Sequence, residues 1–104
     1  MWSIDYLNQE DGILFRFTSN NSSVTYYLNN INILDIDKVK KFKQNIEDFE
    51  YDTLLLDYEI GTHLFYDGEY GLQFGGNMDN TRGYIDMSRL NILNVLNLII
   101  IKLS

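Results

Sequence analysis

The chain has 104 residues, a formal net charge of -7 and no cysteine, and 45% of its residues are hydrophobic and 14% aromatic. This length supports one hydrophobic core, and the aromatic content is typical of a packed domain, so we expect a single domain over residues 1–104 and exclude a disordered tail. The absence of thiols excludes disulfides and a cysteine nucleophile, and the negative charge disfavours contact with nucleic acids and anionic lipids.

The first twelve residues contain three acids and lack the basic and apolar regions of a secretory signal. Together with the lack of cysteine, this predicts a cytoplasmic location. The chain has no Ala and no Pro, whereas Asn, Ile and Tyr are abundant. Such usage is typical of an AT-rich coding sequence, which indicates a low-GC bacterium, or a phage or mobile element of one, as the source.

The N-terminal part predicts strands. Ile13 to Ser19 and Val24 to Leu28 are rich in aromatic and β-branched residues, and polar turn residues separate them. This pattern is typical of a β-hairpin. A shorter strand is expected around Ser3 to Leu7, joined to the hairpin through a turn that ends at Gly12.

A change of period to three and four residues follows the hairpin. The apolar positions are Val39, Phe42, Ile46 and Phe49. They predict an amphipathic helix over residues 37–49, with Asp35 or Asp37 as its N-cap.

The segment after this helix predicts a three-stranded meander. Apolar and polar residues alternate from Leu54 to Ile60, the period of a strand with one buried face, so Asp57 and Glu59 are expected to face solvent. Turns are expected at Gly61-Thr62 and Asp67-Gly68, and the third strand is expected to end at Phe74. Residues 75–83 are expected to form a loop.

The C-terminal segment, Met87 to Leu103, is apolar on nearly every side, with Asn91, Asn94 and Asn97 as a narrow polar stripe. It is too short and too polar for a membrane span. We expect a helix that is buried centrally or packed partly against another chain, although the run of three Ile leaves a strand over residues 98–103 as an alternative. The predicted fold class is therefore α+β, with two helices and one antiparallel sheet of five to six strands.

Candidate catalytic groups are few. His63 is the single histidine, so metal sites with two or three histidines are excluded, and no phosphate-binding glycine motif is present. Two carboxylate pairs, Asp57 with Glu59 and Asp67 with Glu69, resemble the two acids that glycosidases use. They lie on a predicted solvent face and in a turn, where burial would not raise the pKa of one carboxyl group. We expect no catalytic residue, no metal and no cofactor.

Acidic and aromatic residues concentrate between Glu47 and Tyr70. This segment holds eight of the 15 acids of the chain and no Lys or Arg. Carboxylates of one sign attract a basic partner, and tyrosines offer the large contact area with a polar tip that protein interfaces favour. The predicted partner-binding residues are Glu47, Asp48, Glu50, Asp52, Asp57, Tyr58, Glu59, Tyr66, Asp67, Glu69 and Tyr70. A plain solvated surface is the alternative interpretation.

Three hypotheses for function follow. The first is a small acidic, non-catalytic inhibitor, either an immunity-type protein or an anti-defence protein in the manner of an anti-CRISPR. It would cover a basic surface of a nuclease, a toxin or a nucleic-acid-binding complex, with carboxylates in the place of phosphates, and would bind neither nucleic acid nor membrane. The second is a subunit of a homo-oligomer, such as a homodimer, with the C-terminal helix at the interface. The third, a small enzyme that uses the carboxylate pairs, ranks last.

Overall fold

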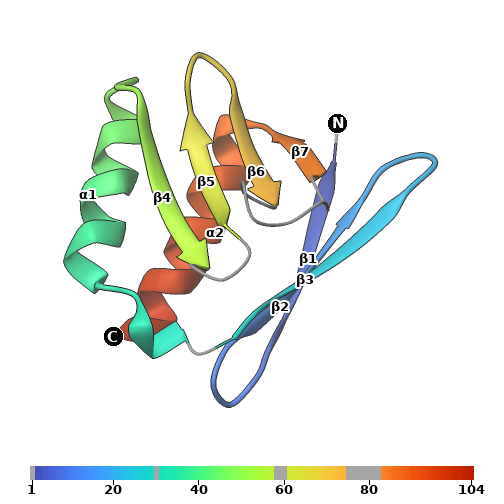
Figure 1. Cartoon of the computed structure of the whole chain (residues 1–104), viewed down its shortest axis with the longest axis horizontal. Helices are drawn as coiled ribbons and strands as arrows, with labels where there is room; N and C mark the ends of the chain where they lie inside the picture. Colours follow the sequence, from blue (N-terminus) through green and yellow to red (C-terminus); the bar gives the residue numbers. More distant parts are fainter. Residues whose placement is uncertain (1, 30, 58–60, 75–82) are drawn as a thin grey trace.

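The structure, a computed structural model, describes residues 2–29, 31–57, 61–74 and 83–104. Its fold is α+β, with two antiparallel sheets and two helices (Figure 1). The elements are β1 (Ser3–Asn8), β2 (Ile13–Thr18), β3 (Ser23–Leu28), a 3-10 helix η1 (Ile31–Ile33), α1 (Ile36–Glu47), β4 (Asp52–Asp57), β5 (Thr62–Tyr66), β6 (Tyr70–Phe74), β7 (Gly83–Met87) and α2 (Arg89–Leu103).

The prediction of one sheet with five to six strands is wrong, because the described residues form seven strands in two sheets. One sheet has the order β1-β2-β3 and the other the order β4-β5-β6-β7. Strand β7 was not expected: Gly83 was predicted to end a loop and Met87 to begin the last helix, and no element was predicted for residues 84–86. Ile85 and Met87 point into the core and Tyr84 and Asp86 point out, which is the alternation of a half-buried strand.

Both sheets and both helices share one hydrophobic core. Helices α1 and α2 pack on the same face of the four-stranded sheet, and Figure 1 shows α2 behind its strands. The inner face of the three-stranded sheet, which includes Phe15 and Phe17, closes the same core. The outer face of the four-stranded sheet, opposite the two helices, is therefore left for other contacts.

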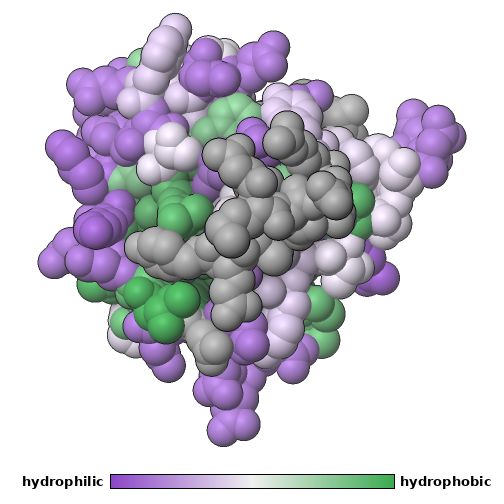
Figure 2. All heavy atoms as spheres, viewed as in Figure 1, coloured by the Kyte–Doolittle hydropathy of each residue, from purple (hydrophilic) through white to green (hydrophobic). Residues whose placement is uncertain are grey.

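Helix α1 confirms the predicted amphipathic helix. Of the two predicted N-cap candidates, Asp35 caps the helix, and its side chain accepts a hydrogen bond from the N–H of the other candidate, Asp37. Hydrophilic residues gather over this helix in the space-filling view (Figure 2). The predicted core position Phe49 is wrong: its side chain is 60% exposed and its φ of 57° is left-handed, beyond the end of the helix. Its ring packs against the guanidinium of Arg89, 4.7 Å from the ring centroid.

Helix α2 confirms a helical C-terminal segment, with Ser88 as its N-cap, and residues 98–103 are helical. Ile92, Val95, Leu96 and Ile99 of this helix are buried in the core. No helix among the described residues has the length and apolar character needed to cross a membrane.

Candidate functional site

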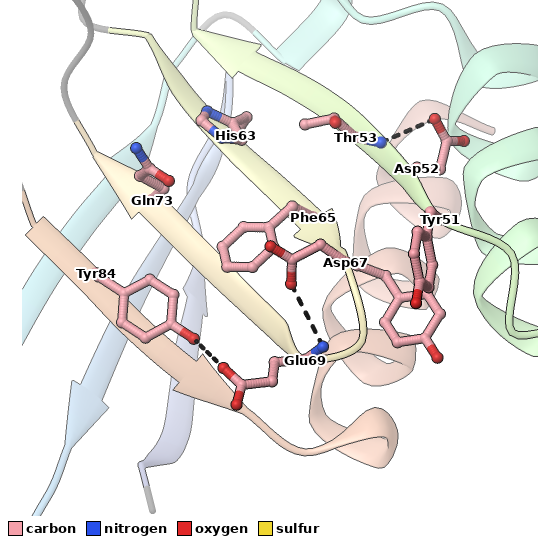
Figure 3. Close-up of a pocket in the computed structure, with 10 residues that line it drawn as sticks. Tyr51, Asp52, Thr53, His63, Phe65, Asp67, Glu69, Gln73 and Tyr84 are labelled. Atoms are coloured by element: carbon pink, nitrogen blue, oxygen red, sulfur yellow. Dashed lines mark hydrogen bonds between the residues drawn. The ribbon is translucent and has the colours of Figure 1, made fainter.

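An open hollow of about 750 Å³ lies on the outer face of the four-stranded sheet, toward the end where β4 begins and β5 ends (Figure 3). We call it the acidic-aromatic hollow. Its lining residues are Tyr51, Asp52, Thr53, His63, Phe65, Tyr66, Asp67, Glu69, Gln73 and Tyr84. Three of them are carboxylates and four are Phe or Tyr, and none is Lys or Arg.

Strand register places the floor of the hollow. Thr53 lies opposite Phe65 and Phe65 lies opposite Gly71, while His63, Gln73 and Tyr84 form the neighbouring row across the sheet. Alternation of side chains along each strand turns all of these toward the outer face.

Gly71 explains why Phe65 is only 9% exposed on an outer face. A Cβ atom at residue 71 would lie 2.7 Å from Cζ of Phe65, so the ring occupies the space that a larger residue would fill. The ring centroid of Phe65 is also 5.6 Å from that of Tyr84. Gly71 on β6 thus lets the ring of Phe65 on the neighbouring strand β5 lie against the sheet.

A tyrosine cluster forms the rim at the β5–β6 turn. The rings of Tyr66 and Tyr70 stack with centroids 4.4 Å apart, and Tyr51 meets Tyr66 edge-on at 5.5 Å. Tyr51 is 74% exposed, so the cluster presents aromatic surface to solvent. Desolvation, and then the neighbouring tyrosines, raise the pKa of Tyr66 above its ordinary value, which keeps its hydroxyl protonated.

The turn from Asp67 to Glu69 brings two exposed carboxylates to the same rim. Gly68 has a φ of 105°, and the Glu69 N–H donates to Oδ1 of Asp67 at 3.4 Å. The hydroxyl of Tyr84 donates to Oε2 of Glu69 at 3.5 Å. A hydrogen bond to Asp86, and then desolvation and the nearby carboxylates, raise the pKa of Tyr84, so this hydroxyl stays a donor at neutral pH.

Asp52 is the third carboxylate, and its orientation is held from two sides. Its Oδ2 accepts a hydrogen bond from Nδ2 of Asn45 at 2.8 Å, and its Oδ1 accepts one from the Thr53 N–H at 2.8 Å. His63 lies further along the floor with its Nδ1 3.0 Å from the Gly61 carbonyl oxygen. If Nδ1 is the donor, Nε2 of the neutral ring is left as an acceptor.

The predicted binding residues are only partly brought together. Four line the hollow and one stacks behind its rim: Asp52, Tyr66, Asp67, Glu69 and Tyr70. Glu47, Asp48 and Glu50 lie outside its lining, near the end of α1, where Glu47 pairs with Lys43 at 3.0 Å. Tyr58 and Glu59 lie outside the described residues.

Asp57 is separated from the hollow, at the other end of β4, beside Tyr26 of the three-stranded sheet. Sequence reasoning missed Phe65 and Tyr84 as members of the hollow. The alternation over residues 83–87 was a usable signal for Tyr84, whereas nothing local indicated that Phe65 covers Gly71.

The contact between the two sheets gives a testable effect of pH. Tyr26 is 6% exposed, and its burial, followed by the Asp57 carboxylate, raises its pKa above the ordinary value of 10.0, with the Thr62 hydroxyl acting in the opposite direction. Above pH 10 the unfolded chain loses this proton while the folded chain keeps it, so the free energy of unfolding falls as pH rises. We expect the wild type to lose about 1.4 kcal/mol per pH unit more than Tyr26→Phe between pH 10 and 12. Urea unfolding at several pH values measures this, and parallel pH profiles would contradict it.

Among the described residues, no group of three or more His, Cys, Asp or Glu side chains is arranged to hold a metal ion. The geometry instead offers carboxylates and aromatic faces, which are suited to contact with a cationic surface. Comparison with protein-family models, with curated proteins and with solved structures finds no match to this chain.

Proposed function

We propose that the protein is a small non-catalytic inhibitor that covers a basic surface of another protein with its acidic-aromatic hollow. The observation that supports this most is the grouping of Asp52, Asp67 and Glu69 with four Phe and Tyr rings in a lining that holds no Lys or Arg. The class of partner is a nuclease, a toxin or a nucleic-acid-binding complex. Its basic surface would meet carboxylates where it otherwise meets phosphates.

The carboxylates would speed the approach of the partner, and the aromatic rings would provide most of the affinity. Grouped carboxylates accelerate association with a basic surface. Salt removes this advantage because the Debye length falls to about 10 Å at 0.1 M. Tyr51 and Tyr84, 74% and 45% exposed, offer ring surface that a partner can cover. The ring of Tyr66 lies between those of Tyr51 and Tyr70, so it is the expected anchor.

The competing hypotheses have less support. Asp67 and Glu69, considered above as an acid–base pair, are both exposed at a turn, where a carboxyl group is not desolvated. For the homo-oligomer, α2 would have to supply the interface. This helix buries Ile92, Leu96 and Ile99 within its own chain and exposes large apolar side chains only at Leu90 and Ile101, near its ends.

The test compares two triple variants that carry the same chemical changes. Asp52→Asn, Asp67→Asn and Glu69→Gln neutralise the hollow, and Asp5→Asn, Asp11→Asn and Glu10→Gln neutralise exposed acids of β1 and its turn. Each triple changes the formal net charge from -7 to -4. The partner is first captured on immobilised wild-type protein and then purified.

We expect the hollow triple to lower the association rate constant at least tenfold at low salt and to flatten its salt dependence, since steering contributes about 10- to 1000-fold. The control triple should change the rate constant less than threefold. Surface plasmon resonance at several salt concentrations gives both quantities, and circular dichroism checks that each variant folds. Equal rate constants for the two triples would place the interface elsewhere.

A further inference from the structure

One part of the acidic-aromatic hollow places an aromatic ring beside a carboxylate. Tyr84, on β7, is 45% exposed, and its ring centroid lies 5.6 Å from that of Phe65 on β5. The Tyr84 hydroxyl donates to Oε2 of Glu69 at 3.5 Å (Figure 3). All three residues line the hollow, so ring surface and negative charge meet at one point of its open space.

Asp67 adds a second carboxylate at this point. Asp67 and Glu69 are both exposed and belong to one turn, where the Glu69 N–H donates to Oδ1 of Asp67. A carboxylate can accept about four hydrogen bonds, so this turn retains acceptor capacity for a donor from another molecule. Asp52 differs, because it is half-buried and accepts a hydrogen bond at each of its two oxygens. The acceptors best placed for a ligand are therefore those near Tyr84.

A ring beside carboxylates suits a guanidinium group better than an ammonium group. A guanidinium is planar, stacks on aromatic faces and carries five N–H donors in a fork that matches a carboxylate. An ammonium is a compact, strongly hydrated charge. The same chain holds one guanidinium in this manner: that of Arg89 lies 4.7 Å from the ring centroid of Phe49, and its Nη2 donates to the Glu47 carbonyl oxygen at 3.2 Å.

The hollow has space and charge for such a group. Its volume of about 750 Å³ is in the range of pockets that accept ligands larger than one side chain. Among the described lining residues there is no Lys or Arg that would neutralise Asp67 and Glu69 from within the hollow. A cationic side chain that enters from another protein would therefore meet an open ring face and two carboxylates.

We propose that Tyr84, Asp67 and Glu69 form a subsite for an arginine side chain of the partner. Its guanidinium stacks on the Tyr84 ring, which Phe65 supports, and donates N–H groups to the two carboxylates. This inference rests on the function proposed above, and it narrows the basic partner to one that presents arginine rather than lysine to this subsite.

The probes are two tripeptides of equal charge, acetyl-Gly-Arg-Gly-amide and acetyl-Gly-Lys-Gly-amide. Each is titrated at low salt into the ¹⁵N-labelled full chain and followed by NMR. We expect the arginine peptide to bind at least about fivefold more tightly than the lysine peptide, because only the guanidinium gains both the stack and the fork. Its binding should shift the amide signals of Glu69 and Tyr84 and leave those of the three-stranded sheet in place.

Matched substitutions separate the ring from the charge. Tyr84→Leu should reduce the preference for arginine to less than about twofold, whereas Tyr84→Phe keeps the ring and should keep the preference. Tyr27→Leu is the control, since Tyr27 is 43% exposed on the other sheet. Glu69→Gln should weaken both peptides at least about fivefold, and Glu10→Gln, an exposed position outside the hollow, should change their affinities less than about twofold. Circular dichroism checks that each variant folds.

The subsite is overturned if neither peptide shifts the Glu69 and Tyr84 signals, or if the wild type binds both peptides equally. It is also overturned if Tyr84→Leu behaves like Tyr27→Leu, or Glu69→Gln like Glu10→Gln. These outcomes differ from those of the partner test. An arginine preference without any effect of the hollow triple on the captured partner would support the subsite and contradict the proposed inhibitor. An effect of the hollow triple without an arginine preference would support the inhibitor and overturn the subsite.

Discussion

Deletion of residues 91–104 is expected to leave a chain without a cooperative unfolding transition. The deleted segment contains Ile92, Leu96 and Ile99, each 0% exposed, and Val95, 3% exposed. Full burial of one such side chain contributes about 1.5 to 3 kcal/mol, and the whole domain has a stability of about 5 to 15 kcal/mol. The four side chains together contribute about 6 to 12 kcal/mol, which is comparable with the stability of the whole domain. Circular dichroism during urea titration is the measurement, and a truncated chain that unfolds cooperatively as a monomer would contradict the expectation.

A pair of single substitutions separates core packing from other effects of truncation. Leu96→Ala removes a fully buried side chain of α2 and should lower the free energy of unfolding by about 2 to 5 kcal/mol. Ile101 lies on the same helix, and its side chain is 72% exposed. Ile101→Ala should therefore change the free energy of unfolding by less than about 0.5 kcal/mol. Similar losses for both variants would indicate that Ile101 is covered in solution, as an interface between chains requires.

Substitution of Gly12 by Ala is expected to be the most damaging change of a single small residue. A Cβ atom at this position would lie 2.0 Å from the Leu28 carbonyl oxygen, which belongs to the main chain and cannot rotate away. The end of β3 must move, which disturbs the pairing of Ile13 with Leu28 and the packing of both buried side chains. Overpacking of this kind costs about 1 to 3 kcal/mol, and a main-chain clash belongs at the upper end of that range.

Gly83→Ala is the matched control for Gly12→Ala. The nearest atom to its added Cβ would be Cδ2 of Phe74 at 3.2 Å, the edge of a half-buried ring that can shift slightly. We expect its free energy of unfolding to differ from the wild type by less than about 1 kcal/mol. Chemical denaturation of both variants under the same conditions gives the comparison. Equal stability of the two glycine variants would show that β3 tolerates the displacement.

Local sequence patterns were sufficient to predict the elements whose signal is contained in a short segment of the chain. The spacing of Val39, Phe42 and Ile46 predicted α1, and the predicted cap residue Asp35 begins it. The turn at Asp67-Gly68 was also predictable, because glycine supplies the positive φ that this hairpin requires. In each case the physical cause lies within a few neighbouring residues.

The division into two sheets depended on tertiary structure. Hydrophobic alternation marks the buried face of a strand, but it does not say which other strand lies beside it. The segment of η1 and α1 separates β3 from β4, and each sheet buries its apolar face in the shared core without pairing to the other. The exposure of Phe49 also depended on tertiary structure. The residue lies after the end of α1, and its left-handed backbone turns the ring toward Arg89.

Sequence composition alone placed acids and tyrosines in one segment, whereas tertiary structure chose which of them meet. Asp52 and Asp57 are five residues apart on β4, and at about 3.3 Å per residue an extended strand holds them roughly 17 Å apart. Antiparallel pairing brings Tyr84 next to Glu69, 15 residues earlier in the chain, and packs Phe65 over Gly71. Strand register and close packing join distant residues in this way, and neither leaves a periodic signal within a single short segment.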